Sequence, residues 1–165
     1  MGAAAAAGGV SAGSQILAAK MQANAIEEQG EFQAQQLKFN SQIAMIQRKE
    51  IEDQADSDSF QKQKEVNQML GAQKASMAAN GLDVTGDLAQ SIQSDTRKTG
   101  QEDVVAIKNN AWREAWGMKV KATDLSNQSN YAIAGSKFGA ATTLITGGLQ
   151  AAGTSADYGY KASKA

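Results

Sequence analysis

The chain has no proline, and between residues 13 and 80 only two internal glycines, Gly30 and Gly71, interrupt a sequence rich in Gln, Glu, Lys and Ala. These residue types favour helices, and no strong turn pattern breaks the stretch. A helix from about residue 14 to residue 79 would be roughly 100 Å long at ~1.5 Å per residue. One such helix cannot build a compact core, so it must lie against partner helices or copies of itself. The sequence predicts an assembly component.

Composition excludes several classes of function. The sequence has no cysteine and no histidine, which removes thiolate nucleophiles, disulfides, the usual zinc ligands and histidine-based acid–base catalysis. Paired acids such as Glu27 and Glu28 lack a partner base, and no phosphate-binding loop or dinucleotide motif occurs. We therefore expect no enzyme activity, no cofactor and no metal. The net charge of −1 gives no strong field toward nucleic acid or acidic membranes.

Three zones follow from the distribution of small and charged residues. Residues 1–19 form a small-residue N-terminal segment, residues 20–130 a long helical body, and residues 131–165 an Ala/Gly-rich segment, a candidate for membrane activity, with a polar tail. The body turns near residues 80–86, where Asn80 and Gly81 suit a left-handed helix C-cap. Thr85 is predicted to cap a second helix over residues 86–126, with Asp87 in its first turn. The predicted fold is an all-α, elongated, oligomeric hairpin of long amphipathic helices.

Two segments favour a bend in these helices. Asp53, Asp56 and Asp58 accompany two serines and are weak helix formers, so any kink or break in the first helix is expected there. Residues 95–103 are polar on all sides and contain Gly100, which predicts a break or a solvated bend in the second helix.

Apolar residues mark the faces expected to meet partners. Phe32, Phe39, Ile43 and Ile46 share one stripe of the first helix, but the apolar steps beyond it are irregular. This favours a helix packed in several successive environments over a regular two-stranded coiled coil. Leu82 and Val84 are expected to pin the turn onto neighbouring helices. Trp112 and Trp116 are expected to anchor helices or subunits, with a membrane-interface pair as the alternative. The predicted interface residues are Phe39, Ile43, Ile46, Leu82, Val84, Trp112 and Trp116.

The C-terminal segment carries small residues every fourth position, at 135, 139, 143, 147 and 151. On a helix this ridge permits very close backbone approach. The stretch from residue 138 to residue 153 is uncharged but shorter than an ordinary membrane span. It is either a tightly packed helix, a flexible glycine-rich loop, or a segment that inserts into a membrane conditionally. Leucine at Gly139 or Gly147 should disrupt a packed ridge, whereas alanine should be much milder than leucine because it still fits a small-residue groove. The residues concerned are Gly135, Phe138, Gly139, Thr143, Ile145, Gly147 and Leu149.

Three sequence runs resemble a known family. They are Ala78-Ala79-Asn80-Gly81-Leu82-Asp83-Val84-Thr85-Gly86, then Ile107-Lys108-Asn109-Asn110-Ala111 preceded by Asp103, and Arg113-Glu114-Ala115-Trp116-Gly117. Together they are similar to the internal virion proteins of short-tailed phages, in particular the smallest core or ejection protein. The turn alone is a weak motif, but combined with the two later runs it is considerably more specific.

The resemblance implies a structural protein packaged inside the capsid near the portal, expelled before the genome, that helps to build a conduit across the host envelope at the outer membrane. Its expected partners are copies of itself, other core or ejection proteins, portal or tail proteins, and the host outer membrane. The loosely clustered basic residues near Arg113 add transient, non-specific contact with phage DNA. A static portal- or tail-associated virion protein is the main alternative, and a secreted pore component is another.

Overall fold

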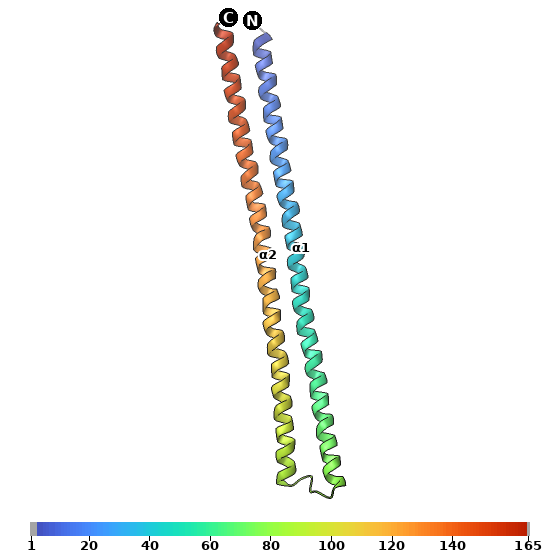
Figure 1. Cartoon of the computed structure of the whole chain (residues 1–165). Helices are drawn as coiled ribbons and strands as arrows, with labels where there is room; N and C mark the ends of the chain where they lie inside the picture. Colours follow the sequence, from blue (N-terminus) through green and yellow to red (C-terminus); the bar gives the residue numbers. More distant parts are fainter. Residues whose placement is uncertain (1–2, 165) are drawn as a thin grey trace. The chain divides into compact units, whose positions relative to one another are not determined.

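The computed structural model consists of two long α-helices joined by one turn (Figure 1). Helix α1 spans Ala3–Ala79 and helix α2 spans Asp87–Lys164. The structure describes residues 3–164, and the side chains of residues 12–154, 156, 157 and 160; residues 1, 2 and 165 of the predicted end segments lie outside it. The predicted all-α fold with two long helices is confirmed. Both helices are longer than predicted, and the C-terminal segment is helical rather than a loop.

Neither of the two segments that favour a bend breaks its helix, because both helices run without interruption through them. In α1, the Nε2 atom of Gln54 donates a hydrogen bond of 2.8 Å to Asp58, and Asp56 lies 3.3 Å from Lys108 of α2. These polar side chains therefore support the helix that carries them. In α2, Gly100 is buried, and an added Cβ there would collide with Val66. Gly100 thus serves close helix packing rather than a bend.

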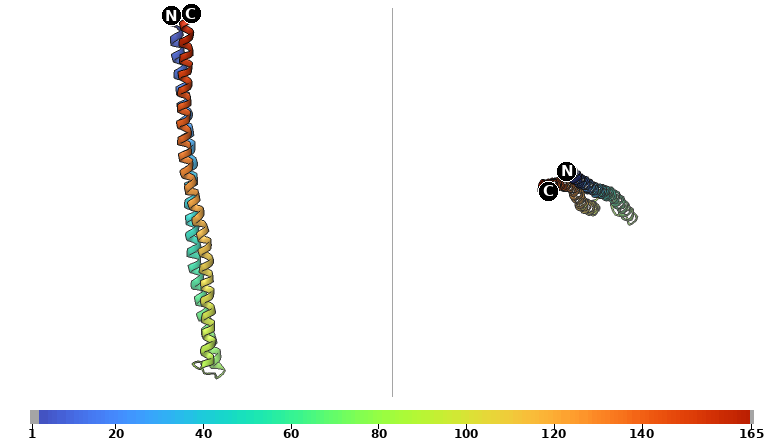
Figure 2. Two further views of the ribbon diagram at one scale, coloured as in Figure 1. Left: turned by 90° about the vertical axis from the view of Figure 1, so that its left-hand side faces the viewer. Right: turned by 90° about the horizontal axis from the view of Figure 1, so that it is seen from above.

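Residue contacts divide the chain into two units, and α1 and α2 each contribute to both. The terminal unit comprises residues 1–41 and 124–165, and the turn unit comprises residues 42–123. Within each unit, a segment of α1 lies beside an antiparallel segment of α2 (Figures 1 and 2).

Small residues form the contact between the helices, which we call the seam. In the terminal unit, a Cβ added at Gly30 would collide with Ser136, and one added at Gly147 would collide with Ala19. In the turn unit, the corresponding close approach is Gly100 against Val66. The only large aliphatic residue among the buried side chains of the described residues is Leu70. The buried seam positions are Ala19, Ala23, Gly30, Ala34, Ala44, Ala55, Ser59, Leu70, Ala89, Gln93, Gly100, Ala115, Ala122, Ser129, Ser136, Ala140, Gly147 and Ala151.

Polar bonds across the seam fix the register of the helices. In the terminal unit, the buried hydroxyl of Ser129 donates a hydrogen bond of 2.8 Å to the carbonyl oxygen of Ala34. In the turn unit, the Nζ atom of Lys62 lies 3.0 Å from an oxygen of Asp103. The hydrogen bond and the charge of Asp103 raise the pKa of Lys62 above its ordinary value. Since the side chains of this ion pair are partly exposed, it specifies register more than it stabilises the fold.

The turn has the C-cap predicted for Asn80 and Gly81. Gly81 has a positive φ of 71°, and the N–H groups of Gly81 and Leu82 donate to the carbonyls of Ala78 and Met77 at 3.0 Å and 2.9 Å. This is the Schellman arrangement, which satisfies the last carbonyls of α1. Asp87 lies in the first turn of α2, as predicted.

Thr85 does not take the capping role predicted for it. Its hydroxyl donates a hydrogen bond of 2.6 Å to Asp83, and its backbone N–H donates one of 2.8 Å to the same carboxylate oxygen. The hydroxyl bond first, and then the N–H bond, hold the pKa of Asp83 below its ordinary value. Asp83 therefore organises the turn as a hydrogen-bond acceptor.

Protection of the Thr85 amide should fall as the medium becomes acidic. A carboxyl whose pKa is lowered by folding contributes fully above its unfolded-state pKa and loses its contribution as pH falls through the folded-state value. Amide hydrogen exchange at Thr85, measured from neutral to strongly acidic pH, checks this. Asp83→Asn is the control, because the amide keeps an acceptor oxygen but does not titrate. An equal loss of protection in both proteins would assign the acid sensitivity to another group.

Candidate interaction surface

Each helix has two apolar faces, and only the small-residue face is covered within the chain. With ~100° between successive residues, the large apolar residues lie roughly 100–180° around each helix from the seam. We call these exposed sets the outer stripes. In the terminal unit they are Leu17, Met21, Phe32 and Phe39 of α1, and Tyr131, Phe138, Ile145 and Leu149 of α2. In the turn unit they are Ile43, Ile46 and Phe60 of α1, and Val105, Trp112, Trp116 and Val120 of α2.

The structure places the predicted interface residues on the outside, except Val84. Phe39 and Ile46 are 61% and 58% exposed, and Ile43 is 37% exposed. Leu82 does not pin the turn within this chain, because it is 56% exposed. Val84 is half-buried, and its carbonyl accepts a hydrogen bond of 3.4 Å from Gln93. The α1 residues share a stripe as predicted, but that stripe faces away from α2.

Trp112 and Trp116 stack on each other on the surface of α2. Their ring centroids are 5.9 Å apart with an angle of 20° between planes, and the two side chains are 64% and 51% exposed. The Nζ atom of Lys119 lies 5.1 Å from the centroid of Trp116, within the range of a cation–π contact. The pair does not anchor α2 to α1, so its predicted role in an interface with another subunit stays a prediction.

The C-terminal ridge is partly the seam of the terminal unit. Gly147 and Ala151 are buried, and Gly139 and Thr143 are half-buried. Gly135 lies off the seam, since a Cβ added there would meet nothing within 4 Å. An added Cβ would lie 3.3 Å from Ile26 at Gly139, but at Gly147 it would collide with Ala19. The premise that alanine fits the ridge therefore does not hold at Gly147, and the expectation that alanine is milder than leucine stays a prediction.

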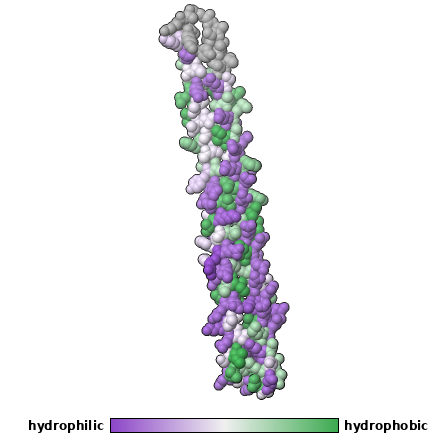
Figure 3. All heavy atoms as spheres, in the orientation of Figure 1, coloured by the Kyte–Doolittle hydropathy of each residue, from purple (hydrophilic) through white to green (hydrophobic). Residues whose placement is uncertain are grey.

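The larger apolar residues of the same segment point away from the seam. Phe138, Ile145 and Leu149 are between 65% and 76% exposed. Within the described residues, no helical stretch combines the length and the hydrophobicity that crossing a bilayer requires. Figure 3 shows hydrophobic side chains scattered among hydrophilic ones on the visible face of each unit. The apolar surface is thus arranged as narrow stripes along helices.

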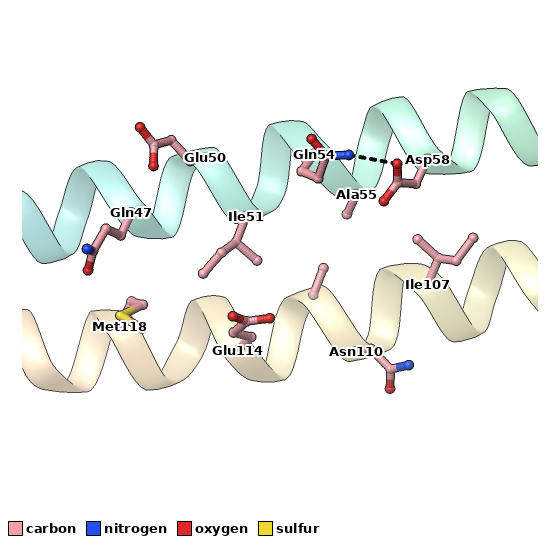
Figure 4. A pocket seen from close by; sticks show the side chains of 11 residues that line it. Gln47, Glu50, Ile51, Gln54, Ala55, Asp58, Ile107, Asn110, Glu114 and Met118 are labelled. Atoms are coloured by element: carbon pink, nitrogen blue, oxygen red, sulfur yellow. Dashed lines mark hydrogen bonds between the residues drawn. The ribbon is translucent and has the colours of Figure 1, made fainter.

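The turn unit also contains an open groove of about 710 Å³ between its two helical segments (Figure 4). Ile51 and Ala55 of α1 point toward α2, while Glu50 points away from it. The polar lining consists of carboxylates and amides, without a lysine, arginine or hydroxyl group. No group of acidic residues suited to a metal ion occurs in the described part of the chain. The full lining is Gln47, Glu50, Ile51, Gln54, Ala55, Asp58, Ile107, Asn110, Ala111, Glu114 and Met118.

The sequence pattern of the C-terminal ridge predicted only part of the seam, and the rest was not predicted. The buried seam positions on α1 recur at steps of four, seven, ten and eleven, and pairs such as Ala19 and Gly30, or Ala23 and Ala34, are eleven residues apart. An eleven-residue repeat keeps one face of a nearly straight helix aligned with a partner. A search for small residues at this period would have found it, whereas a search for large apolar residues finds the outer stripes.

Comparison with known proteins gives a match at the level of the family. The model of the T7 virus internal virion protein gp14 family matches residues 1–165. No curated protein and no solved structure matches the chain.

Proposed function

Because the chain belongs to the T7 virus internal virion protein gp14 family, and is thus an internal protein of a phage virion as its motifs predicted, we propose that it acts in DNA ejection. It is packaged near the portal, leaves the capsid before the genome, and helps to form a conduit for DNA across the host envelope at the outer membrane. The family match over the whole chain is the observation that carries this proposal.

The packing of the helices supports a role that requires passage through a narrow channel. A seam of alanine, glycine and serine buries little apolar area per residue, so separating α1 from α2 within a unit costs less than opening a core of large residues. The hydrogen bonds within each helix are local and reform without long-range pairing. The sequence has no cysteine, so no disulfide links the helices.

The outer stripe of the terminal unit supports a role at a membrane or in a complex. Tyr131, Phe138, Ile145 and Leu149 are exposed along one face of α2, and the sequence from residue 138 to residue 153 carries no charge. Such a face suits lipid, other ejection proteins, or portal and tail proteins. The proposed role is structural, and the groove of the turn unit is lined by carboxylates and amides without a lysine, arginine or hydroxyl group.

Ejection is tested by following the input protein during infection. Virions carrying isotopically labelled chain are used to infect cells in which protein synthesis is blocked, and the cell envelope is then fractionated. We expect labelled chain in the outer-membrane fraction. Label that remains with emptied capsids would instead identify a static portal- or tail-associated component.

A double variant tests whether the outer stripe of α2 is needed for the chain to associate with the cell envelope. Phe138→Asn with Ile145→Asn should leave packaging unchanged but reduce the envelope-associated share of the label. Leu144→Asn is the matched control, because Leu144 is a 46% exposed apolar residue of the same helix segment that lies about 100° or more around α2 from this stripe. Equal envelope shares in both variants would contradict a role for the stripe at the membrane.

A further inference from the structure

We propose that a second copy of this chain docks side by side with the first, with the outer stripe of α1 in one copy packed on the outer stripe of α2 in the next. The copies point in the same direction, and facing helices are antiparallel, as within each unit. The inference goes beyond the proposed function, because such a row of copies would form equally in a protein that never leaves the virion.

In the terminal unit, exposed apolar residues of α1 and of α2 lie at the same height along the helix pair. Ala19 lies against Gly147 across the seam, so a residue two positions later in α1 is level with one two positions earlier in α2. Met21 is therefore level with Ile145, and both are exposed on outer faces. By the same rule Leu17 is level with Leu149. Two neighbouring copies at equal height would bring these apolar side chains together.

The turn unit shows the same correspondence independently. Its register is fixed by Val66 against Gly100 and by the ion pair of Lys62 with Asp103. In this register Ile46 is level with Val120. Phe60 is level, within one residue, with Val105. All four side chains are exposed, from 52% to 70%. When two copies lie side by side at equal height, an apolar residue of α1 in one copy therefore faces an apolar residue of α2 in the next.

Charged residues beside the stripes have complementary signs. At the level of Asp53 on α1, α2 carries Arg113; at the level of Lys64, α2 carries Glu102. All four are exposed, and the ion pairs within the described residues are made by other side chains. When copies meet at equal height, opposite charges face each other at both levels. At the first level α1 carries the negative charge, and at the second level α1 carries the positive charge. A copy shifted by the distance between these levels would meet like charges, so the pattern selects one register.

The contact joins different surfaces of the two copies, which decides how it propagates. An α1 stripe on an α2 stripe is a heterologous interface, and each added copy leaves one free stripe of each kind. Such contacts close into rings or continue as open rows, in contrast to a dimer in which the same surface pairs with itself.

Single cysteines distinguish these arrangements, since the sequence contains none. Met21→Cys and Ile145→Cys chains are purified separately, mixed and oxidised, and the cross-linked products are identified by mass spectrometry of peptides. We expect the mixed 21–145 cross-link to exceed the 21–21 and 145–145 products several-fold. Predominance of either self-product, or failure of the mixed product to form, would overturn the proposal.

Charge reversal tests the register without disturbing the seam. Lys64→Glu and Glu102→Lys should each shift the sedimentation profile toward monomer, and the double variant should restore the wild-type profile. Lys74→Glu is the control, because Lys74 is an exposed lysine of α1 outside the stripe. A double variant that assembles no better than the single reversals, or reversals with no more effect than the control, would contradict this pairing.

Discussion

Gly147→Ala and Gly30→Ala should each lower the free energy of unfolding relative to Gly135→Ala, by about 1–3 kcal/mol. The added methyl groups at Gly147 and Gly30 would collide with Ala19 and Ser136, whereas the one at Gly135 would meet nothing within 4 Å. All three variants gain the same helix propensity, about 1 kcal/mol, which cancels in the comparison. Urea unfolding followed by circular dichroism measures the difference.

The collision at Gly147 cannot be relieved by rotating a side chain. The group it meets is the Cβ of Ala19, whose position is set by the backbone, so the helices must move apart and the neighbouring seam residues lose contacts. Gly147→Leu should be more destabilising still. Gly139→Ala should fall between the extremes, because its Cβ would lie 3.3 Å from a side-chain atom of Ile26. Equal stability of Gly147→Ala and Gly135→Ala would show that the helices do not approach closely at this level.

The sequence predicts features that depend on local chemistry. The turn was recognised because Asn80 and Gly81 tolerate the left-handed C-cap conformation, and Gly81 adopts it. The start of the second helix was recognised from the polar residues of its first turn, where Asp87 lies in the structure. The family was recognised from short runs around the turn and Trp116, and the whole-chain match confirms it.

Features that depend on packing were not predictable in the same way. The expected kink at Asp53–Asp58 ignored partners from α2 such as Lys108, which pairs with Asp56. Gly100 suggested a bend until its place against Val66 was known. Large apolar residues were taken to mark helix contacts, yet Phe32 and Phe39 are exposed and Ala34 is buried. Hydrophobicity ranks side chains by size, whereas close helix packing selects small ones.

Trp116→Ala should weaken self-association by about 2 kcal/mol or more, the loss typical of an aromatic interface hot spot. In the row of copies inferred above, Trp116 lies in the outer stripe of α2 and would be covered by α1 of the next copy. Its removal also ends the stacking with Trp112 and the contact with Lys119. A change of 2 kcal/mol corresponds to a dissociation constant that is roughly 30-fold larger. Sedimentation velocity over a range of concentrations measures this shift.

The effect should be confined to assembly, because Trp116 contributes nothing to the seam. Helicity and urea unfolding of the dissociated chain should stay close to wild type, whereas Gly147→Ala should change unfolding. Met45→Ala is the matched control on the turn unit, since Met45 is 44% exposed but lies outside the outer stripe of α1. If Trp116→Ala and Met45→Ala sediment alike, the tryptophan pair is a solvated feature of α2, and the contact between copies does not include it.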